Sequence, residues 1–178
     1  MALEPKDIQA TLESKCGEFV SDFRMEEDIL TFEVKKDAVK DVIRFMHKND
    51  HLSFNFLTDL CGIHYPQNEK GRTFAVVYLL HNWVDNVRVR VKAYLDADAE
   101  EIDSITEVFA SANWMERETY DFFGIRFAEH PNLRRILNVD DMTSFPMRKE
   151  FPMEDPYRTD KDDRFFGRDQ HNYQPEQK

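Results

Sequence analysis

The chain has 178 residues, a formal net charge of −11 and a hydrophobic share of 41%, which suits one ordinary domain with an appendage. The acidic excess lies in the first part: residues 1–125 carry 24 acidic and 14 basic side chains, whereas residues 126–178 carry 11 and 10. Such a surface repels nucleic-acid phosphates and anionic lipid headgroups, so neither is an expected partner. The plain explanation of the charge is solubility.

Cysteine usage and apolar runs indicate where the chain works. Cys16 and Cys61 have no CxxC or metal-ligand spacing, which is typical of free thiols in a reducing compartment. The first eight residues lack the apolar run of a secretory signal, and no stretch reaches the roughly 18 apolar residues of a membrane span. We therefore expect a protein in the cytoplasm, or one held at a membrane through another protein.

The first predicted element is a helix. Pro5 suits a first helical turn, because its φ is already helical. Ile8, Leu12 and Cys16 follow at intervals of four and share one face of a helix. Gly17 is expected to end this helix in the left-handed conformation.

Two strands and a second helix are predicted next. Residues 19–24 and 29–34 are typical of short strands, with residues 25–28 as the polar hairpin turn between them. Asp37 is expected to cap a helix that runs through His47, because apolar residues recur there at helical spacing.

The middle of the chain predicts a strand and then a hairpin. Apolar and polar side chains alternate over residues 52–58, which indicates a strand with one buried face. A polar turn at residues 68–72 precedes a continuous apolar run at 74–80, which we place centrally in the sheet. A loop at 82–86 joins this run to residues 87–94 as a hairpin. In this last strand three valines alternate with two arginines and a lysine, so it has an apolar and a cationic face.

After an acidic loop at residues 96–103, two helix starts are predicted. Residues 104–107, from a serine to a glutamate, fit a capping box. Residues 113–116, beginning with Asn113, have the asparagine variant of that geometry. The second helix is expected to reach Phe123 and to stop at Gly124.

Hairpins set among helices are typical of an α+β fold. We expect two layers, with helices packed on a mixed, largely antiparallel sheet, followed by an extended C-terminal arm. The compact domain is expected to cover residues 1–125 and the arm residues 126–178.

The expected arm has an unusual composition. Five of the seven prolines lie after residue 125, among singly spaced aromatic residues. Such a segment does not easily build a core of its own, but aromatic rings spaced by prolines suit an arm that docks on another chain. A disordered tail is the alternative. About the last ten residues are expected to be loose in either case.

The sequence lacks the motifs of a catalyst. It has no GxxxxGK or GxGxxG phosphate loop, no GxSxG nucleophile elbow, and no HExxH pair among its six histidines. Paired carboxylates such as Glu100 and Glu101 lie in polar runs, which are normally solvated. We expect no catalytic, cofactor-binding or metal-binding residue in this chain.

One charged cluster stands out at residues 116–124. On a helix, Arg117 and Asp121 are four residues apart and are able to pair. The plain interpretation is a surface helix with ordinary ion pairs, each worth about 0.3–0.5 kcal/mol.

The same cluster resembles the signature of a known family, the C subunit of proton-translocating NADH:quinone oxidoreductase (respiratory complex I), also called its 30 kDa subunit. Residues 145–153 are also similar to that family's Pro-Leu-Arg-Lys-Asp-Phe-Pro segment, with Met147 in place of Leu and Glu150 in place of Asp. The resemblance covers roughly residues 30–156. The signature positions are Glu116, Arg117, Glu118, Asp121, Phe122, Phe123, His130, Arg134, Ile136 and Leu137.

The resemblance implies a cofactor-free structural and assembly subunit of the peripheral arm, which is not catalytic when isolated. It implies packing against the D subunit, which carries the quinone site, with the cluster-bearing B and I subunits nearby, while electrons pass from NADH to quinone. FMN and the iron–sulfur clusters are then on other subunits. The implied location is peripheral, at the cytoplasmic face of the bacterial inner membrane.

We expect the signature residues to lie at a subunit interface and to set its register, because a charge left unpaired there costs about 2–5 kcal/mol. Three alternatives stay open. They are the equivalent subunit of a related quinone-reducing or hydrogenase complex with a different electron donor, a free-standing acidic protein-binding module, and an unrecognised hydrolase. The residues expected to dock the arm are Arg148, Lys149, Phe151 and Pro152.

Overall fold

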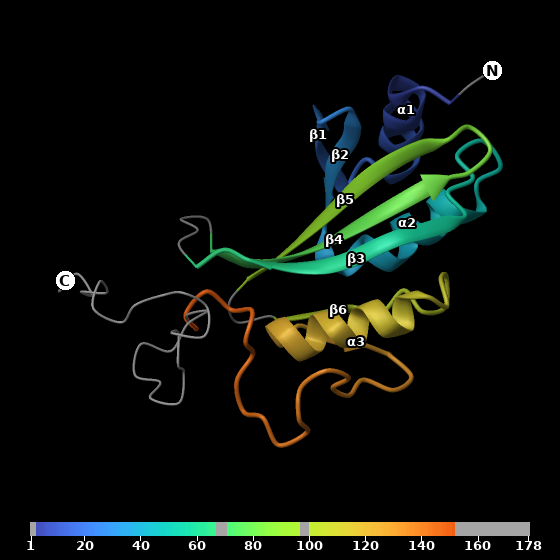
Figure 1. Cartoon of the computed structure of the whole chain (residues 1–178). Coiled ribbons are helices and arrows are strands. Elements are labelled where there is room, and N and C mark those ends of the chain that lie inside the picture. Colours follow the sequence, from blue (N-terminus) through green and yellow to red (C-terminus); the bar gives the residue numbers. More distant parts are fainter. Residues whose placement is uncertain (1–2, 67–70, 97–99, 152–178) are drawn as a thin grey trace, which may run out of the picture.

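The computed structural model describes residues 3–66, 71–96 and 100–151. Its centre is a five-stranded sheet in the order β1-β2-β5-β4-β3 (Figure 1). Only β2 and β5 are parallel neighbours, and the other pairs are antiparallel. A short parallel pair, β6 with β7, forms a second sheet. The strands are β1 (Val20–Glu26), β2 (Ile29–Val34), β3 (Phe56–His64), β4 (Arg72–Asn82), β5 (Val87–Asp96), β6 (Glu101–Asp103) and β7 (Arg126–Ala128).

The helices in the described part of the chain all pack into one core. They are α1 (Pro5–Cys16), the short 3-10 helix η1 (Lys36–Ala38), α2 (Val39–Lys48) and α3 (Ala112–Phe123). Apolar side chains of α1, α2 and α3 join the same buried cluster as one face of the sheet. The predicted α+β fold with a mixed sheet is therefore confirmed. No helix of the described segments is both long and apolar enough to cross a membrane.

The central strand β5 shows how the two faces of the sheet differ. Val89 and Val91 are fully buried in the core, whereas Arg90 and Lys92 alternate with them and lie on the opposite face. The predicted apolar and cationic faces are confirmed. β4 and β5 form the predicted hairpin, and β4 is an interior strand, although β5 takes the central position.

Three predictions about the first fifty residues are wrong in detail. Gly17 is right-handed, with φ −55° and ψ −28°, because the chain continues in a turn in which the Phe19 N–H donates to the Cys16 carbonyl. The predicted turn shrinks to Glu27 and Asp28, whose φ values are 49° and 60°. Positive φ at both positions matches the twist of the flanking strands.

The second helix also starts differently from the prediction. Asp37 lies inside η1, and no side chain caps the start of either η1 or α2. The 3-10 turn makes this entry, since it closes a backbone hydrogen bond from Ala38 to Lys35 and leaves no free position for a side-chain cap.

The strand predicted at residues 52–58 begins only at Phe56. Leu52 and Phe54 are fully buried, but they fill the core from a loop. Ser53 between them has φ 45°, and the Phe54 N–H donates to the Met46 carbonyl of α2. The alternation of apolar residues therefore comes from a loop that is tied to a helix end, and its period of two is accidental.

No helix forms at residues 104–107. Glu107 does not cap Ser104 but pairs with Lys40 and Arg44 of α2, at 3.2 and 2.9 Å. Asn113 lies inside α3, and no side chain caps that helix. The acidic loop predicted at 96–103 contains β6, while residues 97–99 lie outside the described residues.

Gly62 of β3 marks the close approach of α3 to the sheet. A Cβ atom at this position would lie 2.7 Å from Cδ2 of Phe123 and 3.0 Å from Cγ2 of Thr119. Both contacts are tighter than van der Waals packing allows, so α3 seats on β3 only because residue 62 has no side chain.

We predict that Gly62→Ala lowers the free energy of unfolding by about 1–3 kcal/mol, because overpacking displaces α3. Urea denaturation measures this change. The matched control is Thr58→Ala on the same strand, whose exposed side chain predicts a change within about 0.5 kcal/mol. Equal stability of the two variants would show that α3 is not held at this contact.

Candidate functional site: the charged helix α3 and the loop it holds

α3 carries the cluster at residues 116–124 and ends as predicted. Gly124 is left-handed, with φ 79°, and its N–H donates to the Tyr120 carbonyl at 2.8 Å. This closure turns the chain back so that residues 129–151, called here the return loop, run along α3 (Figure 1). Gly124 is also needed for space, since a Cβ would lie 2.6 Å from both Arg148 and Phe145 of the return loop.

Asp121 is the anchor of the return loop. Its buried carboxylate accepts hydrogen bonds from the backbone N–H groups of Ile136, Leu137 and Asn138, at 3.1, 2.8 and 3.0 Å. The Asn138 amide and the Arg135 guanidinium also donate to it, at 3.0 and 2.7 Å. Burial would raise the pKa of the Asp121 carboxyl, but these hydrogen bonds outweigh it and hold that pKa far below its ordinary value.

Arg135 extends this anchor to the far part of the return loop. Besides pairing with Asp121, its guanidinium donates to the carbonyls of Met142 and Ser144, at 2.7 and 3.3 Å. It also stacks over the ring of Phe145 at 5.0 Å. One arginine thus ties three points of the loop to a single carboxylate of α3.

Arg117 does not pair with Asp121, although the helical spacing suggested it. Its guanidinium donates to the carbonyls of Arg134 and Arg135, at 3.1 and 3.3 Å, and stacks over the Trp114 ring at 4.9 Å. The two charges of the predicted pair therefore hold successive parts of the return loop, one through its N–H groups and one through its carbonyls.

Glu116 faces the other side of the helix. Its buried carboxylate accepts from the Ser104 hydroxyl at 2.7 Å and from the Ile105 N–H at 2.8 Å. His130 Nε2 lies 3.9 Å away. Burial raises the pKa of Glu116 to about 7, against the opposing effect of the Ser104 and Ile105 hydrogen bonds.

His130 fixes the start of the return loop as a neutral ring. Its Nε2 contacts the Asn113 carbonyl at 3.1 Å, and its Nδ1 accepts from the Asn132 N–H at 3.0 Å. This pattern requires the tautomer with hydrogen on Nε2. Desolvation also lowers the pKa of His130, which favours the same neutral form.

Arg148 closes the end of the return loop. It donates to the Phe123 carbonyl and to Glu100, both at 2.7 Å, and lies over the rings of Phe74 and Phe145 at 4.8 Å. The next residue, Lys149, donates its backbone N–H to His64 Nδ1 at 2.9 Å. The loop is thereby tied to β3 and β4 as well as to α3.

The signature residues divide into two groups. Glu116, Arg117, Asp121, His130 and the half-buried Phe123 make contacts within this chain. The members that face outward are Glu118, Arg134 and Leu137, and Phe122 and Ile136 are half-buried. Among the residues expected to dock the arm, Arg148 is engaged within the chain, the Lys149 side chain and Phe151 are exposed, and Pro152 lies outside the described residues.

Three contributors to this site were absent from the sequence prediction: Ser104, Asn138 and Glu100. Each lies 12 or more residues from its partner on α3 or the return loop. Neither periodicity nor motif spacing carries a signal for such pairs. Within the described segments, no group of three or more His, Cys, Asp or Glu side chains is placed to hold a metal ion.

The fold places this chain in a class of respiratory-complex subunits. It is similar to a trypsin-resistant fragment of Nqo5, with a TM-score of 0.58 and 29% identity, over 71% of this chain and 98% of that fragment. It shares its fold with a chain of the membrane-bound sulfane sulfur reductase, an archaeal respiratory membrane complex, with a TM-score of 0.69 and 23% identity, over 83% of this chain and 85% of that one.

Sequence relatives define the family. The family model described as the 30 kDa subunit of respiratory-chain NADH dehydrogenase matches residues 32–157. A Rhizobium etli protein, the second of two C subunits of NADH-quinone oxidoreductase by its name, is 38% identical over 86% of this chain and 80% of its own length. The C subunit of Geobacter sulfurreducens is also 38% identical, over 83% and 89%. The chain therefore belongs to the 30 kDa family of peripheral-arm subunits of NADH-quinone oxidoreductase, which confirms the resemblance.

We predict that Asp121→Asn costs about 3–5 kcal/mol of folding free energy. The variant leaves Arg135 buried without a counter-charge and turns an amide group toward backbone donors. Chemical denaturation measures the loss. Asp141→Asn, at an exposed position in the same loop, is the control and should stay within about 0.5 kcal/mol of the wild type. A loss no larger than that of the control would remove Asp121 from its role as anchor.

We also predict a pH effect from Glu116. Between the unfolded pKa of about 4.3 and the folded pKa of about 7, the folded chain keeps a proton that the unfolded chain has released. Its stability therefore falls as the pH rises through this window. The Glu116→Gln variant keeps the hydrogen bonds but does not titrate.

Urea denaturation at a series of pH values tests this effect. Relative to Glu116→Gln, the wild type should lose about 1–3 kcal/mol across the window. His130 titrates in both proteins, so the difference between them is the quantity to use. The exposed neighbour variant Glu118→Gln should follow the wild type. Parallel wild-type and Glu116→Gln curves would contradict the prediction.

Proposed function

We propose that this chain is a cofactor-free, non-catalytic scaffold of the peripheral arm and that it docks on the quinone-site (D) subunit, with the B and I subunits nearby. FMN and the iron–sulfur clusters then belong to other subunits, and the chain is held peripherally at the cytoplasmic face of the bacterial inner membrane. The observation that carries this proposal is the use of the signature charges. They hold a loop in place and do not converge on a space for a substrate.

The surface offered for docking is the outer side of α3 and the return loop. Trp114, Leu137 and Val139 are 63%, 65% and 66% exposed, although they are large and apolar. Met147 and Phe151 are exposed on the same loop. Apolar side chains that gather on one surface in this way are typical of protein interfaces.

Buried charge explains how a loop with little core of its own presents these side chains. Leu137 is fixed at its backbone by Asp121, and Arg135 holds the chain on both sides of Val139. A surface that is ordered before binding loses less conformational entropy when the partner arrives. The signature residues therefore support docking from below, and the exposed apolar side chains make the contact.

The electron donor is a separate question, because the donor site lies on other subunits. The shared fold with a chain of the sulfane sulfur reductase complex is compatible with an equivalent role beside a different donor. The relatives named as NADH-quinone oxidoreductase subunits favour NADH.

We predict that the double variant Leu137→Ser/Val139→Ser reduces co-purification of the quinone-site subunit with a tagged chain by at least about tenfold, because central apolar contacts dominate interface energies. NADH:quinone activity of the membranes should fall in parallel. The isolated variant should stay folded, since both side chains are exposed in the free chain.

Phe19→Ser is the matched control. It removes an exposed aromatic side chain just after α1, and it should leave recovery of the quinone-site subunit unchanged. Native recovery of that subunit with the double variant would overturn the docking surface. Normal recovery without NADH oxidation in any preparation would favour a complex with another donor.

A further inference from the structure

The face of the five-stranded sheet that points away from the core is uncovered in the described part of the chain. α1, α2 and α3 all pack on the opposite, apolar face. An antiparallel sheet with one solvated face normally shows polar side chains there. The β1, β2 and β5 part of this outer face follows that rule, whereas the β4 and β3 part does not.

On β4 the outward positions are apolar. Ala75, Val77 and Leu79 alternate with the core residues of this strand and pair across β3 with Ile63, Cys61 and Asp59. Ala75 and Val77 are buried by their neighbours, while Leu79 and Ile63 stay partly exposed and Cys61 is exposed. β4 thus has the composition of a strand that is covered on both faces, and the described part of this chain covers only one of them.

The corner of the same face is aromatic. Phe56, at the start of β3, meets Trp83 edge to face at 5.3 Å, and His81 stacks on Trp83 at the same centroid distance. Both Phe56 and Trp83 are largely exposed. Tryptophan and arginine are among the side chains most enriched at the energetic centres of interfaces.

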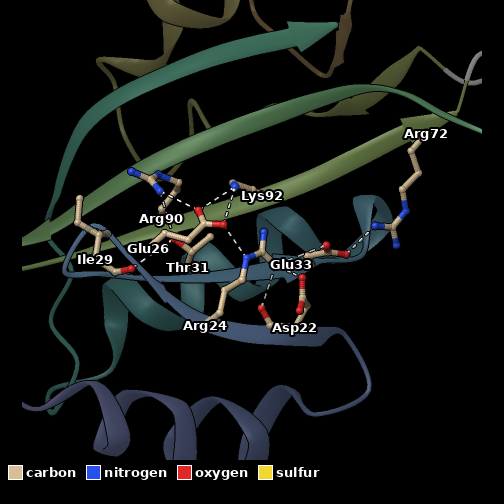
Figure 2. Close-up of polar contacts among 9 residues, drawn as sticks. All are labelled: Asp22, Arg24, Glu26, Ile29, Thr31, Glu33, Arg72, Arg90 and Lys92. Carbon is tan, nitrogen blue, oxygen red and sulfur yellow. Dashed lines mark hydrogen bonds and ion pairs between the residues drawn. The ribbon is translucent and has the colours of Figure 1, made fainter. Parts of the chain in front are cut away.

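Beside the apolar strip lies a cluster of charges from three strands (Figure 2). Glu26 is at its centre and accepts from Arg24 at 2.6 Å, from Arg90 at 2.9 Å and from Lys92 at 3.0 Å. Hydrogen bonds from Arg24 and Lys92 lower the pKa of Glu26 to about 2.

The cluster is short of one carboxylate. Arg24 shares Asp22 as well as Glu26, and Glu33 pairs with Arg72. Arg90 and Lys92 have only Glu26 between them as an anionic partner among the described residues. Both are three-quarters or more buried in the sheet surface, so water screens the remaining positive charge less than it would on a free side chain.

We propose that this outer face binds a segment of a neighbouring subunit that places a carboxylate over Arg90 and Lys92 and apolar side chains over Leu79 and Cys61. The proposal rests on the proposed function, because it takes the chain as a subunit of a larger complex. It adds a second interface to the one formed by α3 and the return loop. Charge complementarity selects an acidic segment even though the chain as a whole is acidic.

Cys61 is a natural reporter for this face. It is exposed, whereas Cys16, the other thiol, is buried. Desolvation and the nearby Asp59 raise the pKa of Cys61, so rates must be compared at one fixed pH. Alkylation by N-ethylmaleimide should be at least about tenfold slower in the assembled complex than in the isolated full-length chain, because the covered thiol is closed to the reagent.

Zero-length carbodiimide cross-linking of the complex identifies the occupant, since it joins an amine only to a carboxylate in contact with it. The expected product links Lys92 to an aspartate or glutamate of another subunit. The double variant Arg90→Gln/Lys92→Gln should restore at least about tenfold of the Cys61 alkylation rate in the complex, because it removes the charges that hold the partner. Arg126→Gln, an exposed cation on β7, should leave Cys61 protected.

Three results would overturn the proposal. Equal alkylation of Cys61 in the free chain and in the complex would leave the face bare. Protection in the isolated chain that disappears on dilution would make a second copy the occupant. Protection that disappears when residues 152–178 are removed would make this chain its own partner. If the double variant does not fold, the wild-type alkylation and cross-link decide alone.

These outcomes are separate from a failure of the proposed function. If the tagged chain recovers no other subunit, the scaffold role fails and the second interface falls with it. If the chain is recovered with its partners and Cys61 still reacts freely, the scaffold role stands and only the second interface is lost.

Discussion

The structure around α3 depends on one buried carboxylate. Asp121 is fully buried, so its charge persists only because backbone N–H groups and Arg135 of the return loop surround it. The same contacts give the loop its shape, since a segment with scattered apolar residues has too little core to fold against. Charge and loop therefore stabilise each other, and neither is stable in this place without its partner.

This dependence connects the signature of the family with its role. Arg117 binds the loop carbonyls, Asp121 binds the loop N–H groups, and Glu116 holds the turn that follows β6. Residues of this kind are expected at catalytic centres, where they would act on a substrate. Here they are used up in positioning a surface, which is the chemistry that a scaffold subunit needs.

The sheet provides the second constraint. Gly62 lets α3 approach β3 closely, so helices fill one face and leave the other to strands alone. On that outer face β5 carries arginines and a lysine, but β4 carries Ala75, Val77 and Leu79. A chain that worked by itself would gain solubility from polar residues at these positions, whereas a subunit enclosed by others has no such need.

Much of this fold was predictable wherever a local rule was enough. The helical spacing of Ile8 and Leu12, the hairpin of β4 and β5, and the stop at Gly124 all depend on near neighbours in the chain. The errors fell where distant groups competed with local ones. Ser104 had a local partner in Glu107, but Glu116 took it, and residues 52–54 looked like a strand until Met46 bound their backbone.

The sequence by itself determined the α+β class, the family and the charged cluster at residues 116–124, because periodicity and motif spacing are properties of neighbouring residues. Only the tertiary structure decided what the cluster does. Its residues are 11 to 18 positions away from the groups that they bind, and a buried charge accepts whichever donors the packed chain brings within hydrogen-bond distance. Those partners are set by the seating of α3 on the sheet, which no short stretch of sequence records.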